Sequence, residues 1–90
     1  MKQHILAKFK NDPVGFLART GIFGLKVKGR QAMACCPFHV ESNPSFSINV
    51  ETGLWHCFAG CGSGDLFTLW RKINSFNGSF FELLQEMDQP

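Results

Sequence analysis

The chain has 90 residues, 44% of them hydrophobic and 18% charged, which is typical of one small globular domain and excludes a disordered tail. No apolar run approaches the length of a membrane span, and the polar, basic start lacks the apolar stretch of a secretion signal, so we expect a cytoplasmic protein with no membrane partner. The net charge of +2 is unevenly distributed: residues 1–30 carry +6 and residues 31–90 carry −4, so the first third of the chain is either a binding surface for a polyanion or a solvated face.

Two helices are expected before residue 22. The first is a short helix over residues 4–9. The second begins at Asp12, whose side chain can cap the first amides, and Pro13 suits the first helical position. Phe16 and Leu17 would face the core, and Gly21 would end the helix.

The period then changes to that of strands. Residues 24–28 alternate apolar and basic side chains, which predicts a half-buried strand that turns at Gly29-Arg30 and returns over residues 31–36. Residues 45–50 alternate again, with Phe46, Ile48 and Val50 on one face, and residues 54–57 return after a turn. The two hairpins predict one antiparallel sheet.

Helical periodicity resumes after Gly64. Asp65 is a good N-cap for a helix over residues 66–73, and Ser79 with Glu82 has the spacing of a capping box for a last helix reaching Met87. The order of elements predicts an α+β fold, an antiparallel sheet flanked by short helices at both ends. We expect one domain over residues 1–90, with a helical N-terminus (1–21), a central ribbon (22–64) and C-terminal helices (65–90).

Cysteine and histidine residues indicate a metal site. Cys36 and His39 stand on a tight turn between two strands, and Cys57 and Cys61 follow the second hairpin. In a cytosolic chain this pattern favours metal over disulfides. Three thiolates and one imidazole form a closed tetrahedral set, which predicts one structural Zn²⁺; buried or redox cysteines and an iron–sulfur cluster are weaker alternatives. A core this small would gain folding free energy from the metal.

Two neighbours of these residues are candidates for ligand exchange. Cys35 could replace Cys36, but strand alternation turns it to the opposite face, and we expect a small buried residue there. His56 points away from the metal by the same alternation, as a packed or surface histidine.

Three short strings carry a resemblance to a known family. They are Cys36-Pro37-Phe38-His39, Pro44-Ser45-Phe46 and His56-Cys57-Phe58. With their surroundings from Gly21 to Leu69 they resemble the zinc-binding domain of bacterial and phage-type DNA primases. The chain departs from cellular primases in its Cys-x3-Cys knuckle, which has Ala59 inserted and which phage- and plasmid-borne relatives tolerate. It also departs at Ser42, where lysine is frequent, and at Trp55, where tyrosine is common.

The resemblance implies a zinc ribbon that binds the single-stranded DNA template and supports primer synthesis during DNA replication. The polymerising activity of primases resides in a separate, larger domain, so no catalysis is expected from this chain alone. The alternative is a stand-alone zinc adaptor that docks onto a partner primase catalytic domain, helicase or polymerase. A third possibility is a purely structural zinc domain.

A basic track and one aromatic residue are the expected DNA contacts. Lys26, Lys28 and Arg30 alternate along one strand and its turn, about 7 Å apart, and can follow a phosphate backbone. Trp55 is the preferred base platform; for Phe58 and Phe46, cover over the zinc site or a core position is the stronger interpretation. Residues 62–65 resemble a phosphate cradle, although a turn followed by the Asp65 cap is the simpler interpretation.

Overall fold

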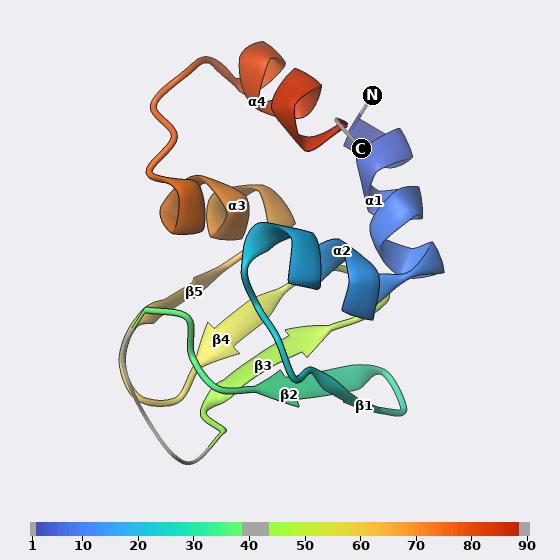
Figure 1. The fold of residues 1–90 in the computed structure, drawn as a ribbon, viewed down its shortest axis with the longest axis vertical. Coiled ribbons are helices and arrows are strands. Elements are labelled where there is room, and N and C mark those ends of the chain that lie inside the picture. Colours follow the sequence, from blue (N-terminus) through green and yellow to red (C-terminus); the bar gives the residue numbers. More distant parts are fainter. Residues whose placement is uncertain (1, 39–43, 89–90) are drawn as a thin grey trace.

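The computed structural model describes residues 2–38 and 44–88, which form one antiparallel sheet with all helices on one side of it (Figure 1). The helices are α1 (Lys2–Asn11), α2 (Pro13–Thr20), α3 (Leu66–Asn74) and α4 (Phe80–Met87). The strands are β1 (Lys26–Lys28), β2 (Gln31–Ala34), β3 (Phe46–Asn49), β4 (Trp55–Cys57) and β5 (Gly62–Gly64). The predicted α+β class, with an antiparallel sheet and helices at both ends, is confirmed.

The five strands lie in the sheet in the order of the chain, and each pairs antiparallel with its neighbours in sequence. The register places Ala32, Ile48 and Trp55 in one row across the sheet, and all three are buried. A second buried row contains Ala34, Phe46 and Cys57. Because side chains alternate along a strand, these rows form the inner face, which packs against the helices, and the intervening residues form an outer face that the helices leave uncovered (Figure 1).

The helix starts follow local capping chemistry. The amide of Gly15 donates to Asp12 Oδ1 at 3.1 Å, and Gly21 ends α2 in the left-handed conformation at φ 108°. Asp65 and Ser79 both complete capping boxes, with Thr68 and Glu82 respectively. These predicted caps are confirmed, and α1 is longer than the predicted residues 4–9.

The strand predicted over residues 24–28 is only partly correct. Strand β1 is three residues long and exposed throughout, and Val27 is 48% exposed where a half-buried strand was expected. The reason is its position: β1 is an edge strand with one neighbour, so the inner face is no longer covered at Val27. Leu25 is buried, but it precedes the strand.

Strand β5 was not predicted, because residues 62–65 were interpreted as a turn and a cap. Gly64 pairs with Trp55 and lies against the start of α3, where a Cβ would collide with the Thr68 hydroxyl. Glycine is therefore required by close approach at this position, and the segment joins the sheet before Asp65 caps α3.

The two ends of the described chain are held together. Asp88, after α4, accepts His4 Nε2 at 3.0 Å and Lys8 Nζ at 3.4 Å from α1 (Figure 1 shows the termini side by side). Within residues 2–38 and 44–88, no helix is long and apolar enough to cross a bilayer.

Candidate metal centre and outer sheet face

Three of the four predicted ligands meet at one end of the sheet. Cys36 follows β2, Cys57 ends β4, and Cys61 precedes β5, and their sulfur atoms all lie within 4.8 Å of one another. Cys36 and Cys57 are buried, at 4% and 1% exposure, while Cys61 is half-buried. His39, the fourth predicted ligand, lies outside the described residues, so the four-ligand set stays a prediction.

The second knuckle is shaped by its backbone. The Gly60 amide donates to the carbonyl of Cys57 at 3.1 Å, and Gly60 and Gly62 adopt φ values of 92° and 123°, which side-chain-bearing residues rarely reach. This tight turn brings Cys61 back toward Cys57 in spite of the extra residue of the Cys-x3-Cys spacing.

The environment makes Cys57 an unusually acidic thiol. Burial acts to raise its pKa, but hydrogen bonds from the backbone amides of Cys61 and Ala59, and contacts with Cys36 and Ser45, outweigh burial and lower the pKa to about 6. Ser45 Oγ lies 3.7 Å from Cys57 Sγ. Cys57 is therefore mostly a thiolate at neutral pH, the form that binds metal.

Cys36 behaves in the opposite way. Burial raises its pKa most, the Phe38 amide opposes this, and the neighbouring Cys57 and Cys61 raise it further, to about 12. One thiolate is stable in the cluster, but a second negative sulfur beside it needs a cation. Three sulfur atoms converge here, and without a cation only one of Cys36 and Cys57 is readily ionised. Such a site suits a divalent, thiophilic ion such as Zn²⁺.

The two residues beside the ligands, Cys35 and His56, are both exposed. Cys35, which follows β2, is exposed and not buried as expected. His56 is exposed on the outer face, as the alternation predicted.

Trp55, the predicted base platform, is buried in this fold. Trp55 is 5% exposed, stacks on Phe46 with ring centroids 5.8 Å apart, and packs against Phe38 at 6.0 Å. Its indole Nε1 donates to the carbonyl of Asp65 at 2.9 Å. The ring and its polar edge thus make core contacts, although Trp55 also lines a shallow hollow at the sheet surface. Phe46 is fully buried, as the core interpretation required.

The outer face offers a different aromatic pair. Phe58 is 68% exposed and contacts His56 edge to face, with centroids 4.7 Å apart. They border a shallow hollow. Its lining residues are Gln31, Ser47, Leu54, Trp55, His56 and Phe58. The alternation of side chains along a strand could have predicted this pair, because it puts Trp55 on the same face as Cys57 and Phe58 on the same face as His56.

The predicted basic track adjoins this hollow through the sheet register. Lys26 and Lys28 pair with Met33 and Gln31 of β2 and are exposed. Arg30 lies in the following turn, with its Nε 3.9 Å from Glu51 Oε1. Gln31 lines the hollow, and Lys28 is its partner on the neighbouring strand β1, so Lys28 lies beside the hollow.

Comparison with known proteins identifies relatives of this chain. Residues 14–89 match the CHC2 zinc finger family, the zinc ribbon of the DnaG type. The DNA primase of Halalkalibacterium halodurans is 42% identical over 64 residues, covering 70% of this chain and 10% of the primase. The DNA primase of Escherichia coli K12 is 47% identical over 62 residues, covering 61% of this chain and 10% of the primase. The chain thus spans about a tenth of the length of these relatives.

A solved structure shares the fold. The zinc-binding and RNA polymerase domains of the Aquifex aeolicus primase match with a TM-score of 0.60 and 23% identity, covering 92% of this chain and 20% of that chain. At this level of identity the match supports the arrangement of helices and strands.

Proposed function

Because this chain belongs to the CHC2 zinc-finger family of DnaG-type primases, we propose that it binds one zinc ion and holds single-stranded DNA template on the outer face of its sheet. The observation that carries the proposal is the uncovered outer face, where exposed lysines adjoin an exposed aromatic pair. Single-strand binders combine a basic track with aromatic rings on which bases stack.

Cys36, Cys57 and Cys61 would hold the zinc, with His39 as the fourth ligand. Four protein ligands leave no open coordination position, so the ion would stabilise structure and would not activate water. It would tie the ends of β2 and β4 to the start of β5, and so fix the part of the sheet that carries His56 and Phe58.

Lys26 and Lys28 would contact phosphates, Arg30 would extend the track, and Phe58 with His56 would receive a base. Side chains two residues apart on a strand are about 7 Å apart, close to the phosphate spacing of an extended strand. The shallow hollow beside Phe58 is open enough for a splayed base, and Gln31 and Ser47 on its floor are joined by a hydrogen bond of 3.0 Å.

Primer synthesis would then be performed by a partner. The much longer relatives are named DNA primases, and this chain corresponds to a tenth of them. We propose that residues 1–90 act as one non-catalytic domain in the cytoplasm and present template to a primase catalytic domain, alongside a helicase or polymerase. The alternative, an adaptor that docks onto such a partner without DNA contact, would use the same exposed Phe58.

Titration with a fluorescent single-stranded oligonucleotide, followed by anisotropy at several salt concentrations, tests the template function. The double variant Lys26→Gln/Lys28→Gln should bind more weakly, with the slope of log K against log salt reduced by about 0.7 for each lost phosphate contact. Phe58→Ala should lose about 1–3 kcal/mol of binding free energy.

The matched control is Lys2→Gln/Lys10→Gln, which removes the same charge from α1. It should change binding little. Equal weakening by both double variants would contradict the basic track, and absence of DNA binding by the zinc-loaded chain would favour the adaptor.

A further inference from the structure

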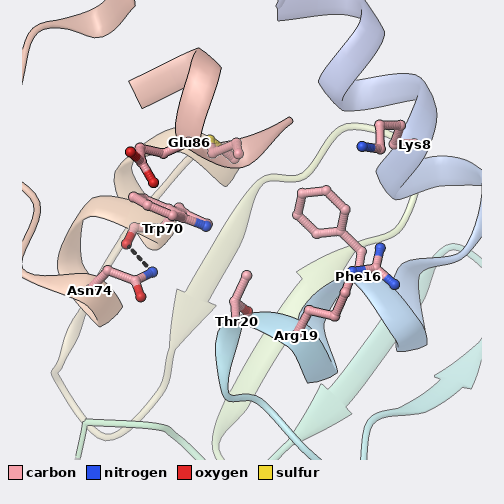
Figure 2. A pocket seen from close by; sticks show the side chains of 8 residues that line it. Lys8, Phe16, Arg19, Thr20, Trp70, Asn74 and Glu86 are labelled. Atoms are coloured by element: carbon pink, nitrogen blue, oxygen red, sulfur yellow. Dashed lines mark hydrogen bonds between the residues drawn. The ribbon is translucent and has the colours of Figure 1, made fainter. Parts of the chain in front are cut away.

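A second hollow lies among the helices, on the side of the sheet away from the outer face (Figure 2). Its volume is about 150 Å³. It is lined by Lys8 of α1, by Phe16, Arg19 and Thr20 of α2, by Trp70 and Asn74 of α3, and by Glu86 and Met87 of α4. Neither the zinc site nor the proposed DNA face uses any of these residues.

The walls of this pocket are aromatic. Phe16 and Trp70 belong to different helices, and Figure 2 shows their rings on opposite sides of the hollow. Phe16 is buried and Trp70 is half-buried, its ring held by Phe76 at a centroid distance of 5.5 Å. Pockets that hold drug-sized ligands measure about 300–1,000 Å³, so this smaller hollow suits one flat ring system with its substituents outside, at the rim.

Charged and polar groups divide between two sides of the rim. Lys8 and Arg19 lie on the side of α1 and α2, while Asn74 and Glu86 lie on the side of α3 and α4 (Figure 2). Lys8 is engaged with Asp88 at 3.4 Å, and so Arg19, whose guanidinium lies over the Phe16 ring at 5.9 Å, is the cation best placed for an anionic ligand. Guanidinium groups bind phosphate through paired hydrogen bonds.

The opposite side accepts hydrogen bonds. Asn74 Nδ2 donates to the carbonyl of Trp70 at 3.0 Å, which leaves its amide oxygen as an acceptor. Glu86 is exposed, and in the described part of the chain no basic side chain lies within ion-pair distance of it. A carboxylate accepts only, so it selects a ring edge with neighbouring N–H donors.

We propose that this pocket binds a guanine nucleotide, with the base between Phe16 and Trp70, the phosphates on Arg19 and the base edge on Glu86. Guanine presents a ring N–H and an exocyclic amino group side by side, and this pair matches one carboxylate. The phosphates of this ligand would thus lie on the side of the rim that carries Arg19, and the N–H donors of its base on the side that carries Glu86. The site adds a small-molecule ligand to a chain whose proposed role is to hold DNA.

NMR spectra of the zinc-loaded 90-residue chain during titration with GTP test the site. The chain has two tryptophans. The indole signal of Trp70 should shift saturably, and that of Trp55, which is bonded to Asp65, should stay fixed as an internal control. Arg19→Gln should weaken GTP binding about tenfold or more, and Glu86→Gln should abolish the preference for GTP over ATP. Lys10→Gln, which removes the same charge from an exposed position of α1 outside the pocket lining, should leave GTP binding unchanged.

Three results would overturn the proposal. The first is a Trp70 signal that does not move up to about 10 mM GTP, well above the millimolar dissociation constant of a weak complex. The second is equal weakening by Arg19→Gln and Lys10→Gln. The third is a Trp70 signal that moves with a guanine-containing oligonucleotide but not with GTP. Loss of DNA binding through Lys26 and Lys28 would leave the pocket untouched, so the two proposals fail separately.

Discussion

The thiol groups of Cys57 and Cys36 differ in acidity although they belong to one cluster. Amide hydrogen bonds in the Cys57 turn lower its pKa to about 6, whereas burial and the neighbouring sulfurs raise that of Cys36 to about 12. The metal-free site thus holds a thiolate at Cys57 and a proton at Cys36 at neutral pH. Binding of a divalent ion must displace the Cys36 proton.

This difference predicts how zinc affinity depends on pH. Between about pH 6 and pH 8 Cys36 must release a proton on binding, so lowering the pH by one unit should weaken binding at least about tenfold. Below pH 6 Cys57 is protonated as well, and the dependence should steepen. Competition with a chromophoric chelator at pH 5–8 measures this, and an affinity that does not change with pH would contradict the assignment of these thiols as ligands.

Trp55 and Phe58 are three residues apart and have different roles. Trp55→Phe removes the indole hydrogen bond to the Asp65 carbonyl and leaves part of the space of the buried indole unfilled, and this should cost about 1–3 kcal/mol of unfolding free energy. Urea denaturation of the zinc-loaded chain measures it. Phe58→Ala, at an exposed position, is the contrasting variant and should change stability little. Equal destabilisation by both variants would show that Phe58 also belongs to the core.

At the scale of elements, local capping chemistry made most helix ends predictable from the sequence. Asp12, Asp65 and Ser79 each accept a hydrogen bond from the amide three residues ahead, so no distant contact is needed to place the helix start. Strand β5 could not be found in this way, since Gly-Ser-Gly has no side-chain period and joins the sheet only through its pairing with β4. The burial of Trp55 likewise depends on α3, which supplies the acceptor for its indole and covers the inner face.

The cap of α3 is expected to contribute measurably to stability. Asp65→Ala removes the acceptor for the Thr68 amide, at 2.8 Å, and should cost about 1 kcal/mol of unfolding free energy. For a domain of this size that corresponds to a fall of about 4–8 °C in Tm. Glu51→Ala is the matched control, because it removes an exposed acid whose only recorded ion pair in the described chain is a contact of 3.9 Å. A control that lowers Tm as much as Asp65→Ala would argue against capping.

At the scale of the whole molecule, the two faces of the sheet have different roles. The inner face and the helices make the core, and the three cysteine sulfurs lie together at one end of the sheet. The contacts of His4 and Lys8 with Asp88 connect α1 to the end of α4 at the opposite side of the molecule. The outer face is left open, and its lysines belong to the basic first third of the chain.

A core this small buries a limited share of its surface, so the metal is expected to supply a large part of the folding free energy. The sequence predicted that Cys36, Cys57 and Cys61 lie close together, because the two knuckles lie where hairpins end. The sequence could not show that one thiol is acidic and the next is not, since that difference comes from amide directions within the folded turn.

The most direct test of the central claim is metal analysis combined with X-ray absorption at the zinc edge on the purified chain. We predict one zinc per chain, bound by three sulfurs and one nitrogen, with loss of both metal and folded structure in Cys57→Ser. A chain that is fully folded without metal, or whose zinc has a different set of ligands, would contradict the account.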